Sequence, residues 1–441
     1  MKRLASVLTI FLVIIFSSWV FAQNNTLSYL RGIAHSDSGL YSAVGDAGLI
    51  ITSEDGVSWS KVALPVAERV NGVVWAMEKF VAVGDKGTIL TSADGKEWTK
   101  VDISGKEMDF NSVASSGNEF IAVGDEGTIL VSKDGTLWEQ RRMATKEKIY
   151  RVRWIKDRYF AVGEPMLILT SMDGITWDEV KADPASAMLF TDIAWNGDKY
   201  IIVGDQSNIW VSENGQEWKQ NEAIPIKEEM YPQCICSVAW TGNKFVAVGD
   251  GGRVLTSSDG ADWKEEDYST NKDLLDIVYS NGKFVAVGEK GIILTSGDGV
   301  KWDNHYSISV QSNNITLKLG QQKKLSIMLN YPYGETEDIT DETLFEVVEG
   351  LDVISVEKNG EVKAIGVGKA IVKATYDTES IEISVNVEKD SGMQSENDGQ
   401  DGEKENSKEK VVKEFLNVFL AVATILIVMA MSFVLSKKQR D

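Results

Sequence analysis

The chain has 441 residues, of which 43% are hydrophobic and 9% aromatic, so it can form more than one domain and is too apolar to be mainly disordered. Its formal net charge of −21 argues against a nucleic-acid partner, which would require a basic binding surface, and fits solubility outside the cytoplasm. The two cysteines, Cys234 and Cys236, are too few for a disulfide framework. Two buried free thiols are favoured over a strained bridge between them, although their redox state stays open.

The first 22 residues have the pattern of a secretory signal peptide. Lys2 and Arg3 provide a basic start, residues 8–16 are apolar, and small residues precede Gln23. Such segments direct a chain across the membrane and are then removed. The sequence therefore predicts that the part of the chain after residue 22 lies outside the cytoplasm.

An internal repeat follows. Residues 80–98 read FVAVGDKGTILTSADGKEW, and variants of this stretch recur with a period near 40 residues. In the second copy, strand candidates at 70–75, 79–83, 88–92 and 98–101 are separated by Gly-Asp-x-Gly and Asp-Gly turns. Four short strands in about 40 residues are typical of one propeller blade. Residues 23–305 are therefore predicted to form a seven-bladed β-propeller in an all-β protein. The seven copies end at Trp59, Trp98, Trp138, Trp177, Trp218, Trp263 and Trp302.

The recurring side chains have structural roles. The aromatic residue that opens each second strand is expected to pack between blades, and the turn glycines permit positive φ. Ser-x-Asp-Gly-x-x-Trp resembles the Asp box of sialidase-type (BNR) propellers. The longer unit AVGDxGTILTSxDGxxW resembles the photosystem II stability and assembly factor family and its non-photosynthetic bacterial relatives. This resemblance implies the propeller fold, and by analogy a role in assembling another protein.

The turn between the second and third strand of each repeat carries one acidic residue. One hypothesis is an anionic ring that holds a cation or a basic partner. The alternative is a set of turn caps, in which each carboxylate accepts backbone N–H bonds; recurrence in every copy favours this alternative. The seven residues are Asp46, Asp85, Asp125, Glu164, Asp205, Asp250 and Glu289.

Departures from the repeat indicate where a ligand could bind. Alignment of the first strands places Arg151 and Arg153 where other copies have small residues, with Asp192 and Asp276 in the same layer. One interpretation is an internal salt-bridge network that fills the channel. The other is a site for a carboxylate-bearing or peptide ligand.

The connection at residues 220–233 is longer than its counterparts in the other copies and carries Lys227 and Tyr231. Long loops on a rigid scaffold often carry recognition, which makes both residues candidate ligand contacts. A tolerated insertion without function is the competing interpretation.

The repeat stops after Trp302. Residues 306–388 alternate in short strand candidates (315–319, 324–329, 353–356, 361–364, 370–376 and 381–387), which favours a small β-sandwich. The stretches LGQQKKL, VISVEKNGEVKA and GKAIVKAT resemble the bacterial Ig-like group 2 (BIG2) pattern, with Phe345 in place of the usual tryptophan. The resemblance implies a spacer domain.

The remaining residues indicate a membrane anchor. Residues 389–411 are polar and of low complexity, which predicts a flexible linker. Residues 412–435 are predicted to form a transmembrane helix, because 415–435 contain no charge. Lys437, Lys438 and Arg440 follow, so residues 436–441 are expected to be a cytoplasmic tail.

Together these features predict a single-pass membrane protein that binds an envelope or surface protein, or a cell-wall glycan, without catalysis. No cofactor or metal is expected, and the oligomeric state stays open. A sialidase-like glycosidase is one alternative, but the propeller has few arginines and five of them lie between 141 and 158, so three from separate blades are hard to assemble. The second alternative is a purely structural stalk-and-head protein.

Overall fold

The structure is a computed structural model that describes residues 29–63, 66–103, 107–141, 145–182, 188–221, 233–267 and 269–389. The predicted signal peptide, transmembrane helix and cytoplasmic tail lie outside these ranges, as does the linker from residue 390 onward. Six 3-10 turns are the helical elements of the described residues. None of these turns has the length or apolar character that crossing a membrane requires.

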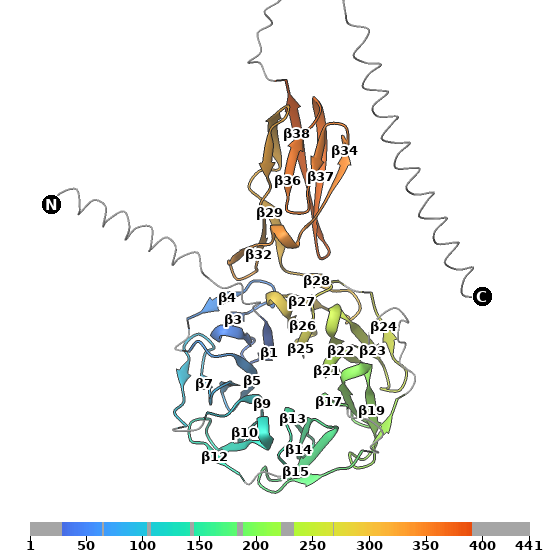
Figure 1. The fold of residues 1–441 in the computed structure, drawn as a ribbon. Coiled ribbons are helices and arrows are strands. Elements are labelled where there is room, and N and C mark those ends of the chain that lie inside the picture. The colour runs from blue at the N-terminus through green and yellow to red at the C-terminus, as the bar shows by residue number, and fades with distance from the viewer. Residues whose placement is uncertain are drawn as a thin grey trace, which may run out of the picture. The chain divides into compact units, whose positions relative to one another are not determined.

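Seven four-stranded antiparallel sheets follow one another along the described chain (Figure 1). The first sheet consists of β1 (Leu30–His35), β2 (Tyr41–Gly45), β3 (Ile50–Ser53) and β4 (Ser60–Val62). The second consists of β5 (Val70–Ala76), β6 (Lys79–Gly84), β7 (Ile89–Ser92) and β8 (Thr99–Lys100). The third consists of β9 (Phe110–Ser115), β10 (Phe120–Gly124), β11 (Ile129–Ser132) and β12 (Glu139–Gln140). The fourth and fifth consist of β13 (Ile149–Ile155), β14 (Arg158–Gly163), β15 (Leu167–Ser171) and β16 (Asp178–Glu179); and β17 (Phe190–Trp195), β18 (Tyr200–Gly204), β19 (Ile209–Ser212) and β20 (Lys219–Gln220).

The last two sheets of the ring have the same order. They consist of β21 (Ile235–Trp240), β22 (Phe245–Gly249), β23 (Val254–Ser257) and β24 (Lys264–Glu265); and β25 (Leu274–Ser280), β26 (Lys283–Gly288), β27 (Ile293–Ser296) and β28 (Asp303–Asn304). Between the second and third strands, five sheets carry a 3-10 turn: η1 (Asp46–Gly48), η2 (Asp125–Gly127), η3 (Asp205–Ser207), η4 (Asp250–Gly252) and η5 (Glu289–Gly291).

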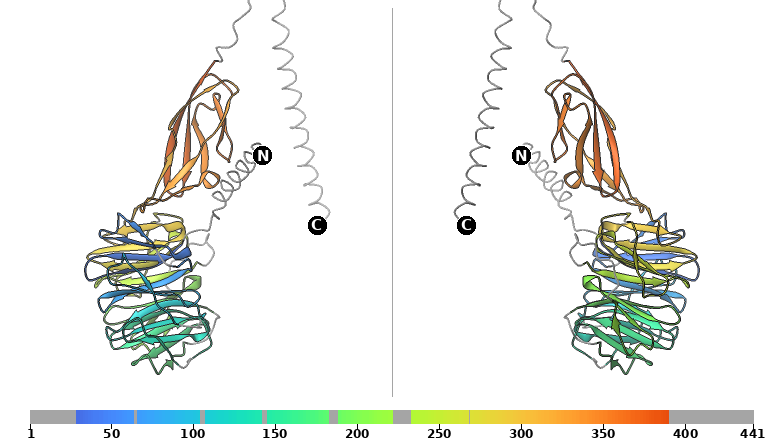
Figure 2. Two further views of the ribbon diagram at one scale, coloured as in Figure 1. Left: turned by 90° about the vertical axis from the view of Figure 1, so that its left-hand side faces the viewer. Right: turned by 90° about the vertical axis from the view of Figure 1, so that its right-hand side faces the viewer.

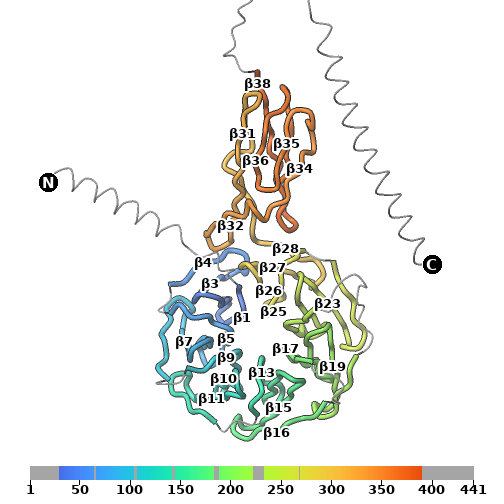
Figure 3. Tube along the Cα trace, in the orientation of Figure 1, coloured from blue at the N-terminus to red at the C-terminus, as the bar shows by residue number. Residues whose placement is uncertain are grey.

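The seven sheets close into a ring. Each first strand lies beside the first strand of the next sheet, and β25 lies beside β1 (Figure 3). Two side views show this ring edge-on (Figure 2). Each sheet takes its four strands from consecutive sequence, so among the described residues no strand is borrowed to close the ring. The prediction of an all-β propeller is confirmed.

The core of the ring lies between neighbouring sheets. The aromatic side chain at or near the start of each second strand is buried, for example Phe80, Phe120 and Phe245, all at 0% exposure. Residues of the first and seventh sheets, among them Tyr41 and Val285, share one apolar cluster. Burial of apolar surface between sheets, rather than within one, therefore stabilises the closed ring.

The Ser-x-Asp-Gly-x-x-Trp hairpin fixes each sheet against the preceding one. In the second sheet, the N–H of Gly95 donates to Ser92 Oγ (2.8 Å), that of Lys96 donates to Asp94 Oδ1 (2.8 Å), and Trp98 Nε1 donates to the Gly95 carbonyl (2.9 Å). Gly95 has a φ of +71°, and a Cβ there would lie 2.6 Å from Leu40 Cδ2 in the first sheet. Glycine is therefore required both by the turn and by the close approach.

A C-terminal β-domain follows the ring, at residues 307–388. Its three sheets have the strand orders β29-β32-β33, β30-β38-β37-β34 and β31-β36-β35. The strands are β29 (Ser307–Val310), β30 (Asn314–Lys318), β31 (Gln322–Lys324), β32 (Ile327–Asn330), β33 (Thr336–Asp338), β34 (Leu344–Glu349), β35 (Ile354–Val356), β36 (Glu361–Ala364), β37 (Gly368–Tyr376) and β38 (Glu379–Glu388), with the 3-10 turn η6 (Thr340–Glu342).

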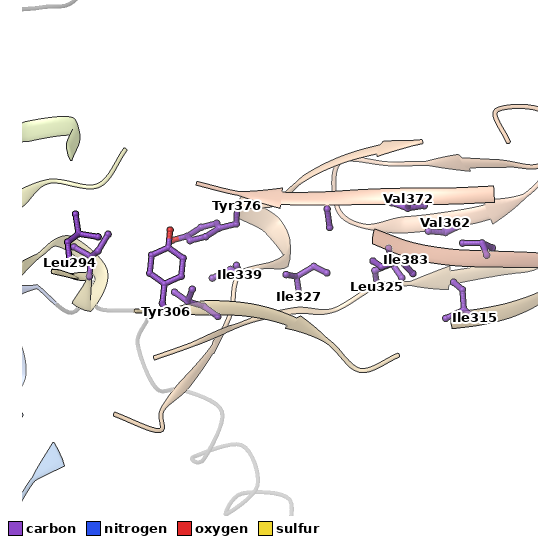
Figure 4. Packing of buried hydrophobic residues seen from close by; sticks show 14 of the residues in the cluster. Leu294, Tyr306, Ile315, Leu325, Ile327, Ile339, Val362, Val372, Tyr376 and Ile383 are labelled. Atoms are coloured by element: carbon purple, nitrogen blue, oxygen red, sulfur yellow. The ribbon is translucent and has the colours of Figure 1, made fainter. Parts of the chain in front are cut away.

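The strand predicted at 324–329 was wrong as a single element. Leu325 and Ser326 interrupt it, and β31 and β32 pair with different sheets. Leu325 and Ile327 are nevertheless both buried, and they extend one apolar core with Ile383 (Figure 4). The alternating pattern therefore predicted correctly which side chains are buried, but it did not predict that the chain moves from one sheet to another at Leu325 and Ser326.

The β-domain packs against the seventh sheet of the ring. Tyr306 OH and Thr270 Oγ1 each donate to Asp377 Oδ2 at 2.5 Å, in the turn between β37 and β38. Lys290, which is 7% exposed, donates to both carboxylate oxygens of Glu342, at 2.5 and 2.7 Å. A continuous apolar cluster runs from Leu294 through Tyr306 into the β-domain (Figure 4).

Candidate functional site

Each first strand of the ring contains one β-bulge close to its N-terminal end. The register of the first and second strands shifts by one residue there, for example between Leu30 and Gly32 in the first sheet. A bulge pushes its extra residue out of the ladder and re-aims the side chain. The seven residues at the shifts are Arg31, Asn71, Asn111, Tyr150, Thr191, Cys236 and Leu275.

All seven bulge residues line one hollow of about 250 Å³, which we call the channel-mouth hollow. Its other lining residues are Arg69, Lys148 and Arg151. Because every sheet contributes a side chain, the hollow lies where the first strands converge. Four of its ten lining residues are basic, in a chain whose net charge is −21.

The acidic turn residues lie around this hollow and are largely engaged. Asp205 and Asp250 accept backbone N–H bonds from Leu189 and Cys234, both at 2.9 Å. Three others pair with basic residues of the hollow: Arg31 with Asp46 (2.6 Å), Arg69 with Asp85 (2.8 Å) and Lys148 with Asp125 (3.0 Å). These contacts favour turn caps and internal ion pairs over a cation-binding ring.

The residues predicted from the departures in the first strands come together. Arg153 donates to Asp192 through Nε (2.9 Å) and Nη2 (2.8 Å), while Arg151 Nη2 donates to Asp276 Oδ1 at 3.2 Å. Ser237 Oγ lies 2.8 Å from Asp192 Oδ2 and 2.9 Å from Asp276 Oδ1. We call these five residues the channel network.

The channel network joins five sheets of the ring. Besides the side-chain bonds, Asp276 accepts the N–H of Ile33 at 3.0 Å, and Asp192 accepts the N–H of Val238 at 3.2 Å. The two arginines belong to the fourth sheet, so they reach across the channel to the seventh. The network thus links side chains whose positions in the sequence lie far apart.

Burial and charge balance define the chemistry of the network. Asp192 is 0% and Asp276 4% exposed, and two guanidinium groups compensate the two carboxylates. Burial alone would raise the pKa of Asp192, but Arg153 and then Arg151 lower it to about 2. The geometry of Arg153, Asp192 and Asp276 matches the internal salt-bridge interpretation, whereas Arg151 also lines the hollow.

The remaining residues that the sequence singled out add little to the candidate site. Lys227 and Tyr231 lie outside the described residues. Cys234 and Cys236 are free thiols that are half-buried rather than fully buried, and Cys236 Sγ lies 3.6 Å from Asp250 Oδ1. The neighbouring Cys234 thiol, then burial, raise the pKa of Cys236 well above its ordinary value, which suppresses the reactive thiolate.

Sequence reasoning missed most of the hollow. Arg31, Arg69 and Lys148 were not predicted as ligand contacts, although Arg31 aligns with the other bulge residues two places before the central valine or isoleucine of each first strand. That column varies between copies and is mostly polar, which is the signal that could have found it. The expectation that three arginines from separate blades are hard to assemble was wrong, because Arg31, Arg69 and Arg151 line one hollow.

A ring of four-stranded sheets with a polar hollow over its axis defines a β-propeller with a candidate ligand site. The chain belongs to the family of the DUF6242 beta propeller domain, whose profile matches residues 22–148 and 171–315. No curated protein matches the chain.

Solved structures share the fold. A structure of YCF48 bound to D1 peptide is 18% identical, covers 62% of this chain and 93% of its own, and has a TM-score of 0.52. A catalytically inactive virginiamycin B lyase from Staphylococcus aureus with quinupristin is 12% identical, with coverages of 62% and 95% and a TM-score of 0.54. At these identities the similarity concerns the fold alone. The two similar structures are a protein solved with a bound peptide and an enzyme.

Proposed function

We propose that the protein is a non-catalytic binding or assembly module that stands outside the cytoplasm on a C-terminal membrane anchor. In this proposal a seven-bladed propeller recognises a carboxylate-bearing peptide segment of an envelope protein, and a BIG2-like Ig domain acts as its spacer. The signal-peptide pattern of residues 1–22 and the uncharged stretch 415–435 support the location.

One observation supports the binding site most strongly: basic side chains gather in the channel-mouth hollow of an acidic protein. Arg31, Arg69 and Lys148 keep 28%, 44% and 32% of their side-chain surface exposed, so a ligand can reach them. A ligand carboxylate would pair with these basic side chains, either displacing the partially exposed turn acids or sharing the basic groups with them. Guanidinium groups bind carboxylates in paired hydrogen bonds. At about 250 Å³ the hollow suits one acidic side chain or chain terminus.

Two further observations favour a peptide over a glycan. YCF48, a propeller of similar fold, has been solved with a bound D1 peptide. Tyr150 is the single aromatic residue among the ten that line the hollow, whereas sugar rings are usually held by stacking on aromatic faces. A wall glycan remains the second class of partner that the experiment below distinguishes.

A sialidase-like glycosidase is a second candidate function. Arg31, Arg69 and Arg151 line the same hollow as Tyr150, and the charge of Glu164 acts on Tyr150. Burial and then Glu164 raise the pKa of Tyr150, however, which opposes its use as a nucleophile. Each arginine also already pairs with a carboxylate. Binding without hydrolysis therefore remains the proposed activity.

The test is a binding measurement on the purified full chain in detergent, with an array of peptides from envelope proteins, each carrying a free or an amidated C-terminus. Peptides with a free carboxylate are expected to bind, and the affinity should fall about tenfold in Arg69→Ala or Lys148→Ala. Lys133→Ala is the matched control, because Lys133 is 75% exposed and lies in a hairpin outside the hollow. Equal binding by all variants would contradict the proposed site.

The same preparation distinguishes the alternatives. If isolated wall polymer binds and the peptides do not, the partner is a glycan. If the protein hydrolyses a fluorogenic sialoside and Tyr150→Phe abolishes this activity, the protein is a glycosidase rather than a binding module. Neither result is expected.

A further inference from the structure

Four exposed aliphatic side chains gather at one end of the C-terminal β-domain. Leu319, Leu351, Ile365 and Val367 keep 48%, 74%, 48% and 49% of their surface exposed. Single exposed aliphatic residues are ordinary, but a group of them on one edge marks a contact surface. We call these four residues the apolar tip.

Backbone hydrogen bonds bring the loops of the apolar tip together. The N–H of Gly320 donates to the carbonyl of Ala364 (3.0 Å), and that of Ile365 donates to the carbonyl of Val353 (2.8 Å). Val353 in turn donates to the carbonyl of Gly350, next to Leu351, at 2.9 Å. The three loops are therefore fixed to one another, so the four side chains share one surface.

The tip lies where the described chain ends. The N–H of Leu319 donates to the carbonyl of Glu388, the last residue of β38, at 3.0 Å. The other end of β38 follows Asp377, which contacts the ring through Tyr306. A strand of ten residues spans roughly 30 Å, so the tip and the ring contact lie at opposite ends of the domain.

We propose that the apolar tip rests in the headgroup region of the lipid bilayer. This inference depends on the proposed membrane anchor: residues 390–414 separate the tip from the uncharged stretch at 415–435. The polar composition of residues 390–411 predicts a linker, and a flexible chain of 25 residues has an average span of roughly 25–30 Å, within which the tip can reach the membrane surface.

The charges around the tip determine how it binds. Lys318, Lys369 and Lys389 are exposed and can interact with anionic headgroups. The exposed Glu349, Asp352 and Glu388 offset them, so insertion of the aliphatic side chains, rather than net charge, holds the tip on the bilayer. Binding by the tip should therefore depend only weakly on salt.

The experiment uses the full chain in vesicles of phosphatidylcholine and phosphatidylglycerol, with both native cysteines replaced by serine. A nitroxide spin label at Leu351→Cys is compared with one at Leu137→Cys, a leucine of the ring that is 77% exposed. The label at 351 is expected to collide more often with oxygen and several-fold less often with a water-soluble nickel complex than the label at 137. Adding Ile365→Asp and Val367→Asp should return the label at 351 to water.

Each outcome has a clear meaning. If the protein floats with the vesicles but the label at 351 stays accessible to nickel, the anchor stands and the tip proposal is overturned. If the protein does not float with the vesicles, both proposals fail. Short distances between labels at 351 on two molecules in detergent would instead assign the tip to contact between copies of the chain.

Discussion

The channel network and the channel-mouth hollow both contain basic side chains paired with carboxylates, but these pairs differ in how deeply they are buried. In the network, Asp192 and Asp276 are almost completely buried and receive hydrogen bonds from arginine, serine and backbone groups. In the hollow, Arg69 and Lys148 pair with turn acids at the surface and remain partly exposed. Arg151 lies at this boundary, because it pairs with Asp276 in the network and also lines the hollow.

This difference separates structural charges from charges that can bind a ligand. A buried ion pair is costly to break, because the remaining partner stays uncompensated in a medium of low polarity. An exposed pair contributes little to stability, because water solvates either partner when the other is removed or moves to a ligand. Substitutions in the network should therefore destabilise the ring, whereas substitutions in the hollow should alter binding.

The largest effect is expected for Asp192→Ala. This change removes an acceptor of Ser237 and a carboxylate that pairs with both arginines, of which Arg151 is only 12% exposed, so the free energy of unfolding should fall by about 3 kcal/mol. Chemical denaturation measures the loss. Asp157→Ala is the control, because Asp157 is 64% exposed and its pair with Arg158 should contribute less than about 1 kcal/mol. Equal losses in both variants would remove the distinction between the two regions.

The repeat explains why the sequence predicted the network. Strands alternate their side chains with a period of two, so equivalent positions in successive copies face the same layer. In the structure, Arg151, Asp192 and Asp276 each lie opposite the same valine position of their second strand, Val162, Val203 and Val287. The alignment of first strands was therefore sufficient to bring the charged residues into one layer.

The hollow was not predicted because it depends on bulges. An extra residue in each first strand changes the direction of one side chain, and no single copy of the repeat shows this shift around Arg31 or Asn71; only the comparison of all seven copies shows a variable, mostly polar position there. The β-domain shows a related limit. β34 is an edge strand whose side chains are mostly exposed or half-buried, so it lacked the apolar alternation by which the other strands were predicted.

A smaller effect is expected from acid. The pKa of Asp192 is lowered in the folded protein, so its contribution to stability is complete above the ordinary pKa of about 4 and is lost as the pH falls toward 2. Between pH 6 and pH 3, the stability difference between wild type and Asp192→Asn should shrink by about 1 kcal/mol. Denaturation curves at the two pH values measure it. A difference that grows in acid would mean that Asp192 is not held ionised by the arginines.

The smallest effect on stability is expected for Arg69→Ala, although it should have the largest effect on peptide binding. Arg69 is 44% exposed and Asp85 21%, so loss of their pair should change the free energy of unfolding by less than about 1 kcal/mol. Asp85 remains hydrogen-bonded to Asn71 at 2.8 Å and is not left without a partner. Thermal unfolding of the variant, measured beside its peptide affinity, tests both halves of the comparison. If Arg69→Ala lowers the stability as much as Asp192→Ala does, the hollow is part of the same structural network, and its basic residues stabilise the fold instead of binding a ligand.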